Sequence, residues 1–198
     1  MTVQQQKAII FDSGTLISLT ITGLLPELKK LKEIFGGVFL ITQDVKKEII
    51  DKPMQIKRFE LSALRLKQLL NEGTIELPSV LGIKDAEMNG GMSKFLNLAN
   101  NTFFEKNKPI KLIDSGEASC LALSIILNAK GIKNVIAVDE RTTRMLGEKP
   151  ENLRRIMQEK LHTKIQAQEK NYEQFKQFKF IRSSELVYVA YNQGVVRI

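Results

Sequence analysis

Five acidic side chains have the types and the spacing for metal-dependent chemistry: Asp12, Glu48, Asp114, Glu117 and Asp139. Asp12 ends the apolar run Ile-Ile-Phe, and Asp139 ends the run Val-Ile-Ala-Val. In open α/β sheets, ligands bind just beyond the carboxyl ends of the strands. Several carboxylates at that edge predict a site for divalent cations, because hard cations prefer oxygen ligands.

Most of these acids also have a local explanation. A carboxylate that follows a strand commonly caps the next helix, as Asp12 could. Asp44 stands in a first helical turn, where the helix dipole favours an acid. Asp114 and Glu117 have the spacing of a capping box. Glu48 is harder to explain in this way, because it lies deeper in its predicted helix beside two isoleucines.

The elements that must position these acids alternate between apolar β-branched runs and amphipathic helical segments. The pattern predicts strands over 7–12, 38–41, 74–77, 135–138 and 178–182. It predicts helices over 16–22, 25–34, 42–49, 54–72, 115–130, 141–146, 150–175 and 185–191. Such alternation is typical of an α/β protein with a three-layer α/β/α architecture around a central, mostly parallel sheet.

Two segments are expected to differ from this regular frame. Residues 83–108 contain Gly90-Gly91 and a polar stretch, which predicts an irregular insertion or mobile segment. We expect a single domain over residues 1–198, with a core of about 7–148 and a charged helical extension over 149–198. Helix 54–72 is expected to place one apolar stripe against the core, formed by Ile56, Phe59, Ala63, Leu66 and Leu70.

Composition restricts the classes of partner and compartment. The chain has 30 Lys and Arg against 22 Asp and Glu, a formal charge of +8, so a polyanion such as nucleic acid is the expected partner. Its single cysteine, Cys120, can form no intrachain disulfide, and its single histidine gives no zinc-finger spacing. The sequence shows no signal peptide and no apolar run of the length that a membrane span needs. We therefore expect a cytoplasmic protein without a membrane partner.

Taken in order, the acidic segments resemble those of the PIN-domain ribonucleases. The matching pieces are Ile9–Ile17, Thr42–Glu48, Gly116–Leu123 and Val138–Arg144. The resemblance covers roughly residues 7–148. It implies a catalytic cluster of Asp12, Glu48, Glu117 and Asp139, with Asp114 as an alternative third acid and further metal ligand. It also implies Ser13 as a supporting hydroxyl, and Glu140 and Arg141 either lie at the surface or help to bind phosphate.

This resemblance implies a Mg²⁺- or Mn²⁺-dependent endoribonuclease that hydrolyses single-stranded RNA. Many such nucleases are toxins of toxin–antitoxin pairs, so an antitoxin protein and a second copy of the chain are further partners to consider. A catalytically weak PIN-like module that binds RNA or a protein is the main alternative. The phrase Asp12-Ser-Gly-Thr also resembles the Asp-x-Asp-Gly-Thr motif of aspartyl phosphatases, but the second Asp is absent.

Overall fold

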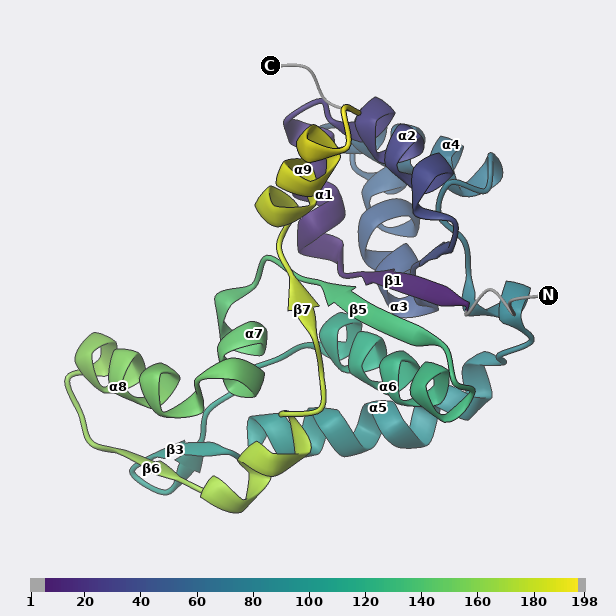
Figure 1. Ribbon diagram of the computed structural model, residues 1–198. Coiled ribbons are helices and arrows are strands. Elements are labelled where there is room, and N and C mark those ends of the chain that lie inside the picture. Colours follow the sequence, from purple (N-terminus) through teal and green to yellow (C-terminus); the bar gives the residue numbers. More distant parts are fainter. Residues whose placement is uncertain (1–5, 196–198) are drawn as a thin grey trace.

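A parallel four-stranded sheet forms the centre of the computed structural model, which describes residues 6–195 (Figure 1). Its strands are β1 (Lys7–Phe11), β2 (Val38–Leu40), β5 (Lys133–Ala137) and β7 (Phe180–Ile181), in the order β2-β1-β5-β7. Ile10 of β1 pairs with Leu40 on one side and with Ile136 on the other. All three pairings are parallel, which confirms the α/β expectation.

Helices cover both faces of this sheet (Figure 1). On one face lie α1 (Ser13–Ile21), α2 (Leu25–Phe35), α4 (Glu60–Asn71) and α9 (Ser183–Asn192). The other face is covered by α6 (Ser115–Ala129), with α5 (Asp85–Asn100) beneath it. The short elements that connect them are α3 (Gln43–Lys46), the π-helix η1 (Lys47–Asp51), the 3₁₀ turns η2 (Pro53–Gln55) and η3 (Pro78–Leu81), and α7 (Arg141–Glu148).

The segment 83–108 is regular, contrary to expectation. It contains the sixteen-residue helix α5 and the hairpin of β3 (Phe103–Glu105) and β4 (Lys108–Pro109). Lys106 and Asn107 both have positive φ at the hairpin turn, as two-residue hairpin loops favour. Gly91 belongs in the helix because it lets α5 approach α6: a Cβ there would lie 3.1 Å from the Cβ of Ala122.

The charged helix predicted over residues 150–175 is not continuous. Helix α8 (Pro150–Leu161) ends at His162, whose φ of 50° is left-handed. The chain then forms β6 (Ile165–Ala167), which pairs with β3 in a second, antiparallel sheet, and the 3₁₀ helix η4 (Glu169–Gln174). Strand β7 lies within the range 178–182 that was predicted as a strand, and it joins the main sheet beside β5.

Two smaller expectations also fail. The predicted helix 54–72 begins only at Glu60, and Ile56 and Phe59 are 48% and 46% exposed instead of facing the core. Residues 74–77 form no strand, although Glu76 makes an isolated parallel bridge to Leu40 at the sheet edge.

The buried apolar residues form one contiguous cluster that extends from Ala8 to Ala190. Within residues 6–195, no helix combines the length and the apolar character needed to cross a membrane.

Candidate functional site

An open cleft lies at the carboxyl ends of β1 and β5 and has a volume of about 410 Å³. It gathers every predicted site residue except Arg141. Its lining consists of Asp12, Ser13, Gly14, Ser18, Glu48, Leu112, Asp114, Glu117, Asp139 and Glu140. Residues far apart in the chain therefore meet at the sheet edge, as expected for parallel strands.

Asp12 is the most buried acid of the cleft, with 4% of its surface exposed. Its Oδ2 caps α1 by accepting a hydrogen bond from the Gly14 N–H at 3.1 Å. Its Oδ1 is also buried, and no group of residues 6–195 donates a hydrogen bond to it. Burial, followed by the negative charge of Glu117, raises the pKa of Asp12 to about 7. Capping therefore accounts for only one of the two carboxylate oxygens.

Glu48 lies in the π-helix η1. The α3 turn precedes it, and the buried Ile49 and Ile50 follow it. The wider turn is closed by the Lys52 N–H, which donates to the Lys47 carbonyl at 3.0 Å. The Glu48 carboxylate lies directly against Gly116 of α6: a Cβ there would lie 2.8 Å from its Oε2. Glycine at this position leaves the space that the carboxylate occupies. Short π-helical segments occur frequently at functional sites.

A buried hydroxyl network holds the elements that carry Glu48 and Glu117 together. Ser119 donates its hydroxyl to the Gly116 carbonyl at 2.6 Å, and Thr42 caps α3 by accepting from the Val45 N–H. The Thr42 and Ser119 oxygens are 2.6 Å apart. Because Ser119 donates its single hydroxyl proton to Gly116, Thr42 is the donor of this second bond. This network fixes α3 against the first turn of α6. The sequence analysis identified Thr42 as a cap but did not identify Ser119.

Glu117 is half-buried, and two groups orient it. Its Oε2 accepts from the Asp114 N–H at 2.7 Å, and its Oε1 accepts from the Thr143 hydroxyl of α7. Burial raises the pKa of Glu117 despite these hydrogen bonds. Asp114 is exposed instead, and its carboxylate forms an ion pair with Lys111. Both acids line the cleft, but Glu117 is the more enclosed of the two.

Asp139 connects the cleft to the C-terminal extension. Its Oδ1 accepts a hydrogen bond of 2.7 Å from the Ser183 N–H, at the start of α9. Glu140 is exposed and caps α7 through the Thr142 N–H. Arg141 is not part of the cleft lining, and its Nε approaches the Met145 sulfur at 3.3 Å. The phosphate-binding role considered for Arg141 stays a prediction.

The acidic side chains concentrate negative charge at the cleft. The charges of Asp12, Glu117 and Glu48 all contribute to raising the pKa of the buried Cys120 thiol, after burial itself. Cys120 makes a weak contact with the Phe11 carbonyl at 3.8 Å and remains a protonated structural residue. Unpaired like charges that line one cleft favour either protonation or a bound cation.

The donor set fits a hard divalent cation such as Mg²⁺ or Mn²⁺. Every candidate metal ligand is a carboxylate oxygen. One of them, Asp12 Oδ1, is buried and accepts no hydrogen bond from the described residues. In the described part of the chain, no three His, Cys, Asp or Glu side chains are already gathered as a ready-made set of metal ligands. The carboxylates instead line the walls of one open cleft.

Comparisons of the chain with protein-family models, with curated proteins and with solved structures give no match.

Proposed function

We propose that this chain is a Mg²⁺- or Mn²⁺-dependent endoribonuclease with a PIN-like fold, which hydrolyses phosphodiester bonds of single-stranded RNA. One observation supports this most strongly. The cleft at the carboxyl ends of β1 and β5 combines several carboxylates with a buried carboxylate oxygen, Asp12 Oδ1, that no described residue satisfies. A structural cap would have no need of this arrangement.

The residues that would hold the cation are Asp12, Glu48, Glu117 and Asp139, with Asp114 at the open side. When bound, such an ion neutralises charge on the phosphate and lowers the pKa of a water. The chain itself supplies the orientation. Thr143 and the Asp114 N–H fix Glu117, the Ser183 N–H fixes Asp139, and Gly116 leaves room for Glu48. Ser13 adds a hydroxyl at the cleft wall.

Asp12 would act as a switch between a proton and a cation. Without a cation, its raised pKa means that near neutral pH the carboxyl is protonated in a large fraction of molecules. A divalent cation stabilises the charged form and displaces that proton. The expected consequence is that metal affinity increases as the pH rises toward and beyond 7.

The charge distribution supports a polyanionic substrate. The whole chain has a formal charge of +8, although the cleft itself is acidic. Cations outside the cleft would attract the RNA backbone, and the bound metal would receive the scissile phosphate. Such contacts give affinity and little sequence preference.

A second candidate function is a catalytically weak module that binds RNA or a protein. It is favoured by the structural hydrogen bonds of Glu117 and Asp139, which occupy oxygens that a metal would also need. The two functions predict different behaviour toward RNA in the presence of a metal.

The test is cleavage of a labelled single-stranded RNA by the purified chain with Mn²⁺, with Mg²⁺, or with excess chelator. We expect cleavage with either ion and none in chelator. A parallel melting experiment should show a Mn²⁺-dependent rise in the melting temperature. Cleavage that persists in chelator would contradict the metal mechanism, and RNA binding without cleavage in any ion would favour the weak module. Hydrolysis of small phosphoesters alone would indicate a phosphatase instead.

A further inference from the structure

Three cavities follow one another along helix α1, and each neighbouring pair shares a wall residue. The acidic cleft shares Glu48 with a second cavity of about 440 Å³, and this second cavity shares Thr20 with a third of about 430 Å³. The start of α1 lines the acidic cleft, and its end lines the third cavity. Its nine residues span about 13 Å at the α-helical rise. A chain-like ligand that followed α1 would therefore meet all three cavities in turn.

The middle cavity is an apolar groove between α1, η2 and α4. Its walls include Ile17, Ile21, Ile56, Phe59 and Leu66. Phe59 directly precedes α4 and is 46% exposed. It therefore faces the groove and not the core stripe predicted from the sequence. The groove is apolar but lies beside Glu48, at the wall of the candidate site.

One exposed cation, Lys52, lines this groove, and others lie next to its wall residues in the sequence: Lys47 precedes Glu48, and Lys57 and Arg58 lie between Ile56 and Phe59. Lys47, Lys52, Lys57 and Arg58 are all exposed, and none forms an ion pair within residues 6–195. The Arg58 guanidinium carbon lies 5.4 Å from the centroid of the Phe59 ring. An exposed aromatic ring beside unpaired cations is the combination with which proteins bind single-stranded nucleic acids.

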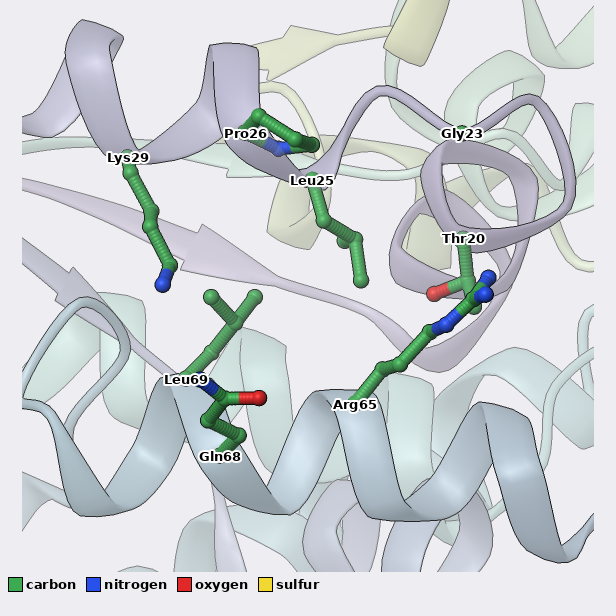
Figure 2. Close-up of a pocket in the computed structure, with 8 residues that line it drawn as sticks. All are labelled: Thr20, Gly23, Leu25, Pro26, Lys29, Arg65, Gln68 and Leu69. Atoms are coloured by element: carbon green, nitrogen blue, oxygen red, sulfur yellow. The ribbon is translucent and has the colours of Figure 1, made fainter.

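The third cavity provides a cation at the far end. Arg65 reaches from α4 toward Thr20 at the end of α1, while Lys29 points from α2 toward Leu69 (Figure 2). Lys29 already forms an ion pair with Glu72. Arg65 has no ion pair among the described residues, so its charge is available for an anion.

We propose that these three cavities form a binding track for single-stranded RNA, an inference that rests on the nuclease function proposed above. The scissile phosphate lies at the acidic cleft with its cation, an unpaired base lies in the apolar groove against Phe59, and a neighbouring phosphate meets Arg65. A base is uncharged and planar, and therefore suits an apolar groove. An acidic protein segment would also suit Arg65, and it is the occupant that remains if the chain binds no RNA.

The test measures binding of a short fluorescent single-stranded RNA to the full chain by anisotropy, in the Asp12→Asn background so that the RNA stays intact. Phe59→Ala and Phe59→Leu should each weaken binding about fivefold or more, because the stacking ring is lost. The matched control is Leu61→Ala, an exposed apolar residue in the first turn of α4 and outside every cavity of the track, which should change binding little. Phe59→Leu retains apolar volume, so it separates loss of the ring from loss of folding.

Arg65→Gln tests the far end of the track against Lys67→Gln, an exposed cation of the same helix that lines none of the three cavities. Both substitutions remove one positive charge from α4. If Arg65 contacts a phosphate, only Arg65→Gln should lower the slope of log affinity against log salt, by about 0.7. Equal effects of the two substitutions would mean that Arg65 acts only through general surface charge, and this would overturn the far end of the track.

The two proposals can fail separately. Metal-dependent cleavage by the unmodified chain, together with RNA binding that neither Phe59 nor Arg65 affects, would keep the nuclease and overturn the track. RNA binding that depends on both residues, without cleavage in any ion, would keep the track and overturn the nuclease. An absence of RNA binding would overturn the track and leave the groove to a protein segment.

Discussion

Asp12 and Asn171 are polar side chains that the fold buries to nearly the same extent, with 4% and 5% of their surfaces exposed. Asn171 follows β6, in the C-terminal region, and its amide donates to the Leu98 and Asn101 carbonyls and to the Thr102 hydroxyl, at 3.2–3.4 Å. Asp12 has one capped oxygen and one without a donor. The Asn171 amide nitrogen therefore has partners within the protein, and Asp12 Oδ1 has none among the described residues.

The difference separates a structural region from a functional one. Around Asn171 the packing is aromatic: Phe103 and Tyr172 form a pair with centroids 6.1 Å apart, and Phe95 packs edge to face on Phe178 at 5.2 Å. The Tyr172 hydroxyl is also buried without a hydrogen-bond partner among the described residues, but unlike the Asp12 carboxylate it does not line the acidic cleft. At the cleft, burial and like charge raise the pKa of Asp12 and so oppose the charged form. Stored electrostatic cost of this kind concentrates at sites that bind ligands.

The comparison is tested most strongly by activity. Asp12→Asn removes a proposed metal ligand while keeping the shape of the side chain, so RNA cleavage should fall by more than about 100-fold, beyond the loss typical of outer-shell changes. Asn171→Ala lies far from the cleft and should retain cleavage at temperatures where it is folded. The measurement is the initial cleavage rate in Mn²⁺ for both variants. Near-normal cleavage by Asp12→Asn would show that Asp12 is only a helix cap.

Stability without metal should change in the opposite direction. The pKa of Asp12 rises from 3.8 to about 7 on folding, which corresponds to about 4 kcal/mol of destabilisation at neutral pH. The folded state holds this proton more tightly than the unfolded chain, so the cost is absent below pH 3.8 and grows as the pH rises toward 7. Burying the asparagine amide offsets about 1–3 kcal/mol, and the net gain for Asp12→Asn should be about 1–3 kcal/mol.

Urea unfolding in chelator at several pH values checks this expectation. The advantage of Asp12→Asn over the unmodified chain should increase between about pH 4 and about pH 7 and then level off. Asn171→Ala should instead lose about 1–3 kcal/mol at every pH, because it leaves buried carbonyls without donors. The measured quantity is the difference in unfolding free energy between Asp12→Asn and the unmodified chain. If this difference is the same at pH 7 as at pH 4, the assigned burial cost is contradicted.

The parts of the fold with a strong apolar period were predictable from the sequence. Strands β1 and β5 and helix α6 lie within a few residues of the ranges predicted from their apolar runs. The start of α4 was not predictable in this way, because Ile56 and Phe59 continue the helical spacing and yet line an exposed groove. Helix α5 was missed because Gly90-Gly91 indicated a break, whereas close packing on α6 requires a small residue at Gly91.

Four carboxylates of the site were predictable because Asp12 and Asp139 follow strands, and Asp114 and Glu117 begin a helix, at the same sheet edge. Glu48 was predicted on a different ground, its place within a helix beside two isoleucines. The groups that support these carboxylates were not predictable. Thr143 contacts Glu117 across 26 positions of sequence, and the Ser183 N–H reaches Asp139 across 44. The Gly116 contact with Glu48 depends on how α6 packs against η1. These contacts arise from tertiary packing, and local spacing gives no signal for them.

Gly116→Ala tests whether the position of Glu48 matters apart from its charge. The new Cβ would lie 2.8 Å from Glu48 Oε2, so the carboxylate must move. We expect metal affinity to fall about 10- to 100-fold, as for other changes that displace a ligand. Gly90→Ala is the control, because it is also a helical glycine but has open space around its Cβ position. The measurement is the Mn²⁺ concentration that half-saturates the melting shift, and equal values for both variants would contradict the contact.

Thr143→Val should have the smallest effect. It keeps the side-chain shape and removes the hydroxyl that donates to Glu117 Oε1, so Glu117 keeps only the hydrogen bond from the Asp114 N–H. Mn²⁺ affinity should fall about tenfold, the lower end of the range for groups that orient a ligand. Thr142→Val is the matched control on the same helix, since its side chain makes no hydrogen bond among the described residues. Because the Thr143 bond favours the charged form of Glu117, its loss should also shift the midpoint of metal binding to higher pH. A merely structural Thr143 would lower the melting temperature without moving that midpoint.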